Sequence, residues 1–451
     1  MPPHRLVRRW GRTLALLTVT LCLTSAQPAP AVSRSPAVVL DHDFADPDVV
    51  RSGGVFHAYA THSGGRHVQH ATSRDLRHWT LDDSDLLPTP GAWAAPRPDL
   101  VWAPEVFDHG DGFTLQYTAR DRASDRQCIG VARSASPNGP FRPVGDTPLI
   151  CPAQEGGAID AATYTEGGQR YILWKNDGNC CHLGKDTWLH LQPTSWDGTR
   201  VTGDPVRLIR QDQPWENHLV EAPTLIKRAG HYVLLYSANA YDGSAYATGY
   251  AVSRSLTGPY TKAPHPLMTT DGFSGAVQGP GGQDVVTGPD GRDRIVFHGW
   301  TGSGRALHLA DLSWADGHPV VHGGKVIHQA ERAHVHNASV RDAPEASDGK
   351  VVGYIDHPDS HVEFRVPAAS AGPRTLSVRF ANGSLDTAGS PAPATHRLSV
   401  NGTDTGVVHY PHTSWGTWRT AVTTITLKTG WNTITLSKGA LFAELDYIEV
   451  G

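Results

Sequence analysis

The 451-residue chain has few sulfur-containing and few charged residues. It contains 5 cysteines, 2 methionines and 18% charged residues, and its 39 basic residues are outnumbered by 44 acidic ones. This charge balance disfavours nucleic acid or an anionic membrane as the main partner. After residues 1–26 there is no uncharged apolar run of 18 residues, so no transmembrane helix is predicted. CxxC and HExxH motifs are also missing, which disfavours a zinc site.

The chain is rich in turn-forming and aromatic residues. It has 47 glycines, 33 prolines, 13 tryptophans and 13 tyrosines, and 39% of its residues are hydrophobic. That is enough apolar material for folded cores, and the many turns argue against a helical bundle. The length predicts two or three domains.

Residues 1–26 have the pattern of a secretory signal peptide. Residues 1–12 are basic, and residues 13–26 are apolar and end in small residues, with cleavage expected near Ala26 or Ala31. An uncleaved anchor is the alternative; a lipoprotein at Cys22 is disfavoured because Thr20 and Leu21 precede it. We therefore expect a secreted, extracellular monomer that does not contact a membrane after cleavage, with 35 basic against 44 acidic residues, or −9.

Four cysteines remain after such cleavage, at positions 128, 151, 180 and 181. An oxidising compartment would allow three pairings of them. We prefer a disulfide between Cys128 and Cys151, because it closes a short loop between adjacent segments. The neighbouring Cys180 and Cys181 form a strained bridge or remain free.

A repeat of about sixty residues runs through most of the chain. Turn-like segments begin at Ser73, Ser134, Ser195, Ser253 and Ser313, at spacings of 61, 61, 58 and 60. Each follows two or three strand-like runs joined by Gly-containing turns. Five such units predict an all-β fold with a five-bladed β-propeller over residues 38–322.

Acidic or amide residues recur at the start of the first strand of each unit. They are Asp46, Glu105, Asp160, Glu221 and Gln283, at spacings of 59, 55, 61 and 62. The first strands of propeller blades line the axis, so we interpret these positions as equivalent and expect them to converge at one end of the channel. Acids this close would shift each other's pKa values. A single acid would more often cap a turn or bind a central cation, but four in register favour a site.

Glycoside hydrolysis needs one protonated and one ionised carboxyl group on opposite sides of the scissile bond. A ring of acids beside aromatic side chains meets that need. Trp102 and Trp215 flank acid-bearing segments and are expected to face a sugar, whereas Trp174 is expected to pack between blades.

Several of these segments resemble glycoside hydrolase family 43. The resemblance lies in FADPDVVR, WAPEV, AIDAATY, VEAPTLIKRAGHYVLLYSAN and YATGYAVSRSLTGPY, and it covers roughly residues 40–315. It implies a five-bladed propeller that hydrolyses arabinans, arabinoxylans, xylo-oligosaccharides or galactans with inversion.

The resemblance also implies residue roles. Asp46 matches the general base, Asp160 the residue that raises the pKa of the acid and orients it, and Glu221 the general acid. Asp48 is a weaker rival for the base and is expected on the opposite face of its strand or in the turn. Glu105 stands where many members have Asp and is expected in the wall of the site.

The sequence departs from the family at one position. Many members have a GPGH motif in the fifth blade, near a central cation or water, whereas this chain has Gly-Gly-Gln at 281–283. Gln283 or His298 is expected to take that role, and a metal in the propeller stays uncertain.

Residues 325–451 change to alternating strands with Gly-, Asn- and Pro-rich turns, which predicts a β-sandwich. HQAERAHV, VVGYIDHPDSHVEFRVP, RFANGS, LSVNG, GWNTITL and LDYIEV resemble carbohydrate-binding modules of families 35 and 6. The resemblance implies a structural calcium ion at Gln329, Glu331 and Asp446, with Gln329 in place of a usual Glu. For sugar binding, the expected residues are Tyr354, Asn382, Trp415 and Trp418.

Together these patterns predict a secreted inverting glycosidase with a sugar-binding module, acting on arabinose-containing plant polysaccharide. An α-L-arabinofuranosidase or exo-arabinanase is favoured. The alternatives are a β-xylosidase or galactan-active enzyme, and a propeller lectin that binds sugar without cleaving it.

Overall fold

The computed structural model describes residue 1 and residues 36–368 and 370–451. Apart from Met1, the expected signal peptide at 1–26 lies outside the described residues. Within the described part of the chain, none of the helices has the length and apolar character needed to cross a membrane.

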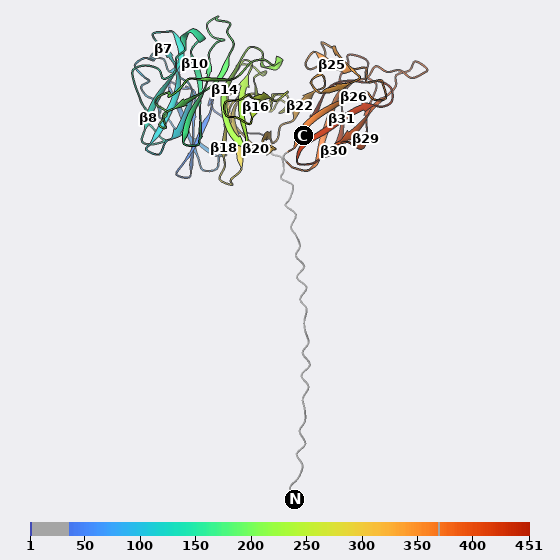
Figure 1. The fold of residues 1–451 in the computed structure, drawn as a ribbon, viewed down its shortest axis with the longest axis horizontal. Coiled ribbons are helices and arrows are strands. Elements are labelled where there is room, and N and C mark those ends of the chain that lie inside the picture. The colour runs from blue at the N-terminus through green and yellow to red at the C-terminus, as the bar shows by residue number, and fades with distance from the viewer. Residues whose placement is uncertain (2–35, 369) are drawn as a thin grey trace. The chain divides into compact units, whose positions relative to one another are not determined.

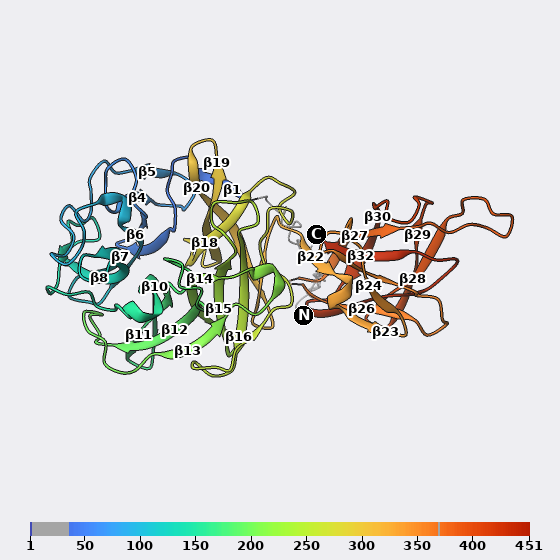
Figure 2. The same ribbon diagram turned by 90° about the horizontal axis from the view of Figure 1, so that it is seen from above.

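Five antiparallel sheets of four or five strands form the propeller, coloured blue to yellow in Figures 1 and 2. Blade 1 holds β2 (Asp48–Ser52), β3 (Val55–Ala60), β4 (Gln69–Ser73) and β5 (Trp79–Leu81). Blade 2 holds β6 (Trp102–Asp108), β7 (Phe113–Asp121), β8 (Arg126–Ser134) and β9 (Arg142–Pro143). Blade 3 holds β10 (Ala158–Glu166), β11 (Gln169–Asn176), β12 (Trp188–Thr194) and β13 (Val206–Arg210). Blade 4 holds β14 (Val220–Arg228), β15 (His231–Ala238), β16 (Ala247–Ser253) and β17 (Thr261–Lys262).

Blade 5 joins the two ends of the propeller. It contains β18 (Gln278–Thr287), β19 (Asp293–Thr301) and β20 (Gly304–Ala315), with β21 (His318–Val321) paired to β20. Its outer strand is β1 (Ala37–Leu40), which pairs with β20 through Ala37 opposite Leu309. The first strand of the described chain therefore closes the ring of blades, and the predicted five-bladed propeller is confirmed.

Tight glycine turns connect the first two strands of several blades. Gly53 and Gly54 both have positive φ (55° and 81°) between β2 and β3, and Gly167 and Gly168 (59° and 79°) repeat this between β10 and β11. Two successive left-handed residues make the hairpin turn that matches strand twist. The first strand of each blade lies toward the axis, and Figure 2 shows β6, β10, β14 and β18 around the centre of the ring.

The remaining strands form two sheets, coloured orange and red in Figure 2. One sheet has the order β24-β25-β32-β27-β30 with β22 paired to β32, and the other has the order β23-β26-β31-β28-β29. Their bounds are β22 Val326–Gln329, β23 His334–His336, β24 Ser339–Asp342, β25 Lys350–Gly353, β26 His361–Ala368, β27 Gly372–Ala381, β28 Ala394–Val400, β29 Thr403–Tyr410, β30 Arg419–Leu427, β31 Gly430–Lys438 and β32 Glu444–Val450. Buried residues from both sheets, such as Val378 and Leu436, share one core, as expected for the predicted sandwich.

Candidate active site

A cavity of about 590 Å³ lies among the innermost strands of all five blades. Cavities of this size hold small ligands. Six of the predicted site residues line it: Asp46, Trp102, Glu105, Asp160, Glu221 and Gln283.

Besides Gly279 (φ 57°) in β18, each blade places one left-handed residue in or just before its innermost strand. The five residues are Asp46 (φ 51°), Ala103 (41°), Asp160 (58°), Ala222 (49°) and Gly282 (56°). Four of their N–H groups donate to side chains: Asp46 to His298, Ala103 to Thr61, Ala222 to Asp160 and Gly282 to Ser237. Non-glycine residues adopt this conformation only at a cost in free energy, so the surrounding contacts have to hold it.

This repeat corrects the predicted alignment of the acids. Only Asp46 and Asp160 occupy the left-handed position. Glu105 lies two residues after it in blade 2, Glu221 one residue before it in blade 4, and Gln283 one residue after it in blade 5. The five predicted residues are therefore not equivalent, although all five reach the same cavity.

Asp46 is held as a carboxylate. Thr61 Oγ1 donates to its Oδ2 at 2.5 Å, and Arg305 Nη1 lies 3.4 Å and His298 Nδ1 3.3 Å from its Oδ1. Burial alone would raise the pKa of Asp46, but Arg305, His298 and Thr61 outweigh it and hold the pKa well below its usual range. Asp46 is therefore ionised at neutral pH.

Glu221 has different partners. Lys175 Nζ donates to its Oε2 at 3.1 Å, and the Tyr246 hydroxyl donates to its Oε1 at 2.8 Å. Lys175 is almost completely buried and also contacts Asp177 Oδ1 at 3.3 Å. The positive charge of Lys175 is thus shared between two carboxyl groups.

Asp160 carries the raised pKa in this part of the cavity. Burial and then the nearby Glu221 carboxylate raise the pKa of Asp160 to about 8, against the effect of Lys175. Its Oδ2 accepts a hydrogen bond from the Ala222 N–H at 2.9 Å. Asp160 therefore retains a proton beside Glu221 at neutral pH, and the expectation made for Glu221 from the sequence stays a prediction.

A second group of carboxyls, also in the cavity lining, links neighbouring blades. Asp48 Oδ2 accepts from the Val106 N–H at 2.9 Å, and Glu105 Oε1 accepts from the Thr163 N–H at 2.7 Å. Asp284 Oδ2 accepts from the Val49 N–H at 3.0 Å. The sequence analysis placed Asp48 on the opposite face of its strand or in the turn, and this was wrong, because Asp48 lines the cavity.

Burial and mutual repulsion make these acids hard to ionise. Burial, followed by Glu105 and Asp284, raises the pKa of Asp48 well above its usual range. Burial and then Asp284 raise the pKa of Glu105 to about 8, and burial raises that of Asp284 to about 6. Asp48 and Glu105 therefore hold protons at neutral pH, whereas Asp284 is mostly ionised.

Two predicted residues of the propeller lie away from the cavity surface. Trp215 stacks on Tyr236 at 5.9 Å between ring centroids, and its indole N–H donates to Gln213 Oε1 at 2.7 Å. His298 is fully buried behind Asp46. Trp215 therefore does not face a sugar, and His298 acts on Asp46 instead of on a ligand. Trp174 packs on His190, as predicted.

Sequence reasoning missed Lys175, Tyr246 and Arg305, all of which line the cavity. Lys175 ends the apolar run YILWK, and a lysine inside a buried strand signals a buried counter-charge. Tyr246 is the first residue of the quoted motif YATGYAVSRSLTGPY, but the spacing of the acidic residues pointed neither to it nor to Arg305.

The predicted sugar-binding residues of the sandwich differ in exposure. Tyr354 is 65% exposed and Trp415 is 49% exposed. Asn382 is fully buried; its side-chain amide donates to Ala392 O and Tyr410 O and its Oδ1 accepts from the Ser384 N–H. Trp418 packs against a small apolar cluster at Ala343, Ala346 and Val351. Asn382 therefore holds the fold together, and the prediction that it faces a ligand was wrong. Trp418 is half-buried, and its sugar-binding role stays a prediction.

The expected calcium ligands fit a cation only in part. Both carboxylate oxygens of Glu331 are buried without a hydrogen-bond partner, which suits a cation, although Arg332 Nε lies 3.6 Å from Oε1. Ser347 Oγ bridges Gln329 Oε1 at 3.1 Å and Asp446 Oδ1 at 2.7 Å, but Arg379 also pairs with Asp446. Among the described residues, three ligating groups within 4.8 Å of one another occur only at Asp121, Cys128 and Cys151.

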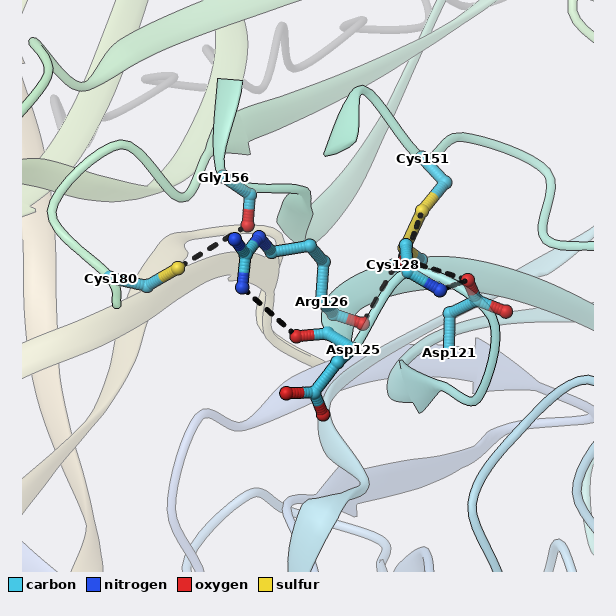
Figure 3. The surroundings of a disulfide bond; sticks show 8 residues. Asp121, Asp125, Arg126, Cys128, Cys151, Gly156 and Cys180 are labelled. Carbon is cyan, nitrogen blue, oxygen red and sulfur yellow. Dashed lines mark hydrogen bonds between the residues drawn. A yellow bond between two sulfur atoms is a disulfide. The ribbon is translucent and has the colours of Figure 1, made fainter. Parts of the chain in front are cut away.

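Cys128 and Cys151 are joined by a disulfide (Figure 3), and Cys180 and Cys181 are free thiols. The disulfide is the pairing preferred from the sequence. It also explains the apparent metal-binding group at Asp121, because disulfide sulfur atoms are not thiolate ligands.

Comparison with known proteins points to one family. The sequence profile of glycosyl hydrolases family 43 matches residues 35–319, more than half of the chain. The chain is 27% identical to the extracellular endo-α-(1→5)-L-arabinanase 1 of Bacillus subtilis, covering 69% of this chain and 98% of that protein. It is 28% identical to an extracellular exo-α-(1→5)-L-arabinofuranosidase of Streptomyces chartreusis, covering 66% and 92%. The crystal structure of a thermostable family-43 glycoside hydrolase superposes with a TM-score of 0.55 at 30% identity, covering 62% of this chain and 92% of that one.

Proposed function

The chain belongs to glycosyl hydrolase family 43, and we propose that it is a secreted enzyme that hydrolyses arabinose-containing plant polysaccharide. It is an inverting glycoside hydrolase, and the substrate class that we propose for it is arabinose-containing plant polysaccharide. The extracellular arabinanase of Bacillus subtilis and arabinofuranosidase of Streptomyces chartreusis support both the substrate and the location. We favour an α-L-arabinofuranosidase or exo-arabinanase.

The contrast between Asp46 and Glu221 carries this proposal. An inverting enzyme needs an ionised base that activates water and an acid that protonates the leaving oxygen. Arg305, His298 and Thr61 keep Asp46 ionised, so Asp46 is the base. In this role its carboxylate accepts the proton of the water that attacks the anomeric carbon.

Glu221 is the general acid in this proposal. Lys175 and Tyr246 orient its carboxyl group. Asp160 and Glu221 together retain one proton up to a pH of about 8, and in this proposal Glu221 carries that proton when it acts as the acid. Glu221 gives its proton to the glycosidic oxygen as the bond breaks. When the acid ionises, the Lys175 ammonium and the Tyr246 hydroxyl stabilise the resulting carboxylate.

The proposal includes the C-terminal sandwich as a carbohydrate-binding module. Tyr354 and Trp415 support this role, because exposed aromatic rings stack on sugars. The proposal also includes a structural calcium ion at Gln329, Glu331 and Asp446. The buried Glu331 oxygens, which have no hydrogen-bond partner, support this ion, and the contact between Arg379 and Asp446 counts against it. Thermal unfolding with calcium against a chelator tests it: a higher Tm with calcium supports the ion, and an equal Tm rejects it.

The substrate is tested on aryl α-L-arabinofuranoside, aryl β-xyloside, aryl β-galactoside and debranched arabinan. We expect arabinose release that Glu221→Gln abolishes. Activity only on the xyloside or galactoside would keep the mechanism and replace the substrate. Binding of arabinan without turnover of any substrate would favour a lectin.

A further inference from the structure

A strained loop with two free cysteines lies at the cavity. It connects β11 to β12 over residues 177–187, and three of its residues line the cavity: Asp177, Asn179 and Cys180. Cys180 is half-buried and Cys181 is exposed. None of the roles assigned above to the cavity residues uses these thiols.

The backbone of this loop is unusual at the second cysteine. Cys181 has a φ of 57° and His182 a φ of 59°, so two successive non-glycine residues are left-handed. Each costs about 1 kcal/mol or more, and such strain persists where the surrounding structure or a function requires it. Gly184 in the same loop is also left-handed (φ 59°), but glycine adopts this conformation freely, so the backbone cost falls on Cys181 and His182.

The two thiols are placed to react with each other. They are neighbours in sequence, so their side chains leave the backbone at consecutive residues of one loop. Cys180 Sγ donates to Gly156 O at 3.5 Å, and Figure 3 shows this side chain pointing toward Gly156. The existing disulfide shows that the fold accommodates oxidised cysteines a short distance away in the same part of the propeller.

We propose that Cys180 and Cys181 form a disulfide with each other in the mature protein, and that this disulfide is part of the wall that contacts the sugar. The second half of this inference rests on the proposed function. A disulfide between neighbouring residues makes a small, rigid ring whose sulfur atoms present a flat apolar surface. Such a surface suits the hydroxyl-poor face of a pentose ring.

The oxidation is a thiol–disulfide exchange with an external disulfide, such as a cellular disulfide oxidase or oxidised glutathione. The exposed Cys181 attacks the oxidant first and forms a mixed disulfide, releasing one thiol. Burial, followed by Cys181, raises the pKa of Cys180 to about 12, so Cys180 reacts second. Its sulfur displaces the second oxidant thiol from Cys181, so two protein thiols are oxidised and one external disulfide is reduced to two thiols.

The loop is also coupled to Glu221. The Cys180 N–H donates to Asp177 O at 3.0 Å, Asp177 Oδ1 lies 3.3 Å from Lys175 Nζ, and Lys175 Nζ lies 3.1 Å from Glu221 Oε2. Closing the ring at Cys180 restricts the Asp177 backbone at the start of this chain of contacts. Oxidation is therefore expected to hold both the wall and the Lys175 contact in one geometry.

Mass spectrometry tests the disulfide without reference to activity. The secreted protein is denatured, alkylated with iodoacetamide without reductant, and digested. We expect the peptide containing Cys180 and Cys181 to be unalkylated and two mass units lighter than its reduced form. Alkylation of both cysteines would overturn the proposal.

Kinetics test the contact with the sugar. After mild reduction, we expect KM for an arabino-oligosaccharide to rise about 3- to 10-fold with a smaller change in kcat. The matched control is the double variant Cys180→Ser/Cys181→Ser, which should show the raised KM and no further response to reductant. A disulfide found by mass but with KM unchanged by reduction and in the variant would refute the substrate contact. Absence of arabinoside turnover in the untreated protein would reject the proposed function and leave the mass result standing.

Discussion

At the scale of single residues, Asp46 and Glu221 differ in the charges around them. Asp46 faces the guanidinium of Arg305 and the ring of His298, whereas Glu221 faces the ammonium of Lys175 and the hydroxyl of Tyr246. The two acids start from similar chemistry, and their neighbours assign them different roles. Substitution of those neighbours should therefore change the roles in different ways.

Removal of the Arg305 charge should raise the pKa of Asp46. Arg305 is the largest influence that lowers this pKa, so Arg305→Met is expected to move the acidic limb of the pH–rate profile upward by about one pH unit or more. Arg305→Lys keeps the charge and should move the limb less. An unchanged acidic limb in Arg305→Met would contradict the assignment of Asp46 as the base.

Removal of the Lys175 charge should destabilise the protein. Lys175 is buried and pairs with Glu221 and Asp177, so Lys175→Met leaves buried carboxylates unpaired and should cost about 3–5 kcal/mol in the free energy of unfolding. The matched control is Lys227→Met, which breaks the more exposed pair with Glu166 and should destabilise the protein much less. Denaturant unfolding measures the free energy of unfolding of both variants. Equal losses would show that Lys175 does not neutralise buried carboxylates.

At the scale of elements, the innermost strands are connected by polar side chains instead of apolar packing alone. Asp48 reaches blade 2, Glu105 reaches blade 3, Asp160 reaches blade 4 and Asp284 reaches blade 1. Between blades 4 and 5 the Thr224 hydroxyl donates to Gln283 O at 2.7 Å. Because Thr224 links blades 4 and 5, Glu221 does not have to make this contact. Its carboxyl group can therefore face the cavity with Lys175 and Tyr246.

The acids of this ring should make stability depend on pH. The pKa of Glu105 is raised to about 8 in the folded protein, so its stabilising effect is present below about pH 4.5 and is lost as the pH rises to about 8. Glu105→Gln keeps the oxygen that accepts from Thr163 and carries no proton to lose. We expect its free energy of unfolding to fall less than that of the wild type between pH 5 and 8, by an amount on the order of 1–3 kcal/mol, as measured by denaturant unfolding at each pH.

The control for this prediction is Glu345→Gln, at an exposed position of the sandwich. It should follow the wild-type dependence on pH. If the stability of Glu105→Gln showed the same dependence on pH as the wild type, the Glu105 carboxyl would be ionised in the folded protein at neutral pH.

The sequence predicted the blades well and the positions within them less well. The sixty-residue repeat reports the turns between strands, so it located all five blades. Residue spacing could not show that Glu105, Glu221 and Gln283 lie at different positions from Asp46, because the irregularities in β6, β14 and β18 absorb residues. Trp215 flanks an acid in sequence but points into the blade, and side-chain direction at a strand end is set by packing that a linear motif does not contain.

At the scale of the whole molecule, the family profile matches the propeller, at residues 35–319. Carbohydrate binding by the sandwich is therefore a proposal. Its strands were predicted because alternation of buried and exposed residues is visible in sequences such as VEFRVP. Its binding residues were harder to predict: Asn382 has the right residue type but is used within the fold.

Trp415→Ala should weaken binding of the full-length protein to insoluble arabinan or arabinoxylan by about 10-fold, without changing kcat/KM on an aryl arabinoside. The control is Trp196→Ala, which removes a tryptophan of similar exposure (51% against 49%) from the propeller. Equal pull-down of the Trp415→Ala variant and the wild type would remove Trp415 from the binding surface.

The most direct test of the central claim compares kcat/KM for Glu221→Gln and Asp46→Asn on two arabinofuranosides. One substrate has a dinitrophenyl leaving group, which needs no protonation, and the other is an arabino-oligosaccharide, which does. We predict that Glu221→Gln loses about 10³-fold on the oligosaccharide and little on the dinitrophenyl substrate, whereas Asp46→Asn loses activity on both. An equal loss on both substrates for Glu221→Gln, or retained activity in Asp46→Asn, would contradict the assignment of acid and base.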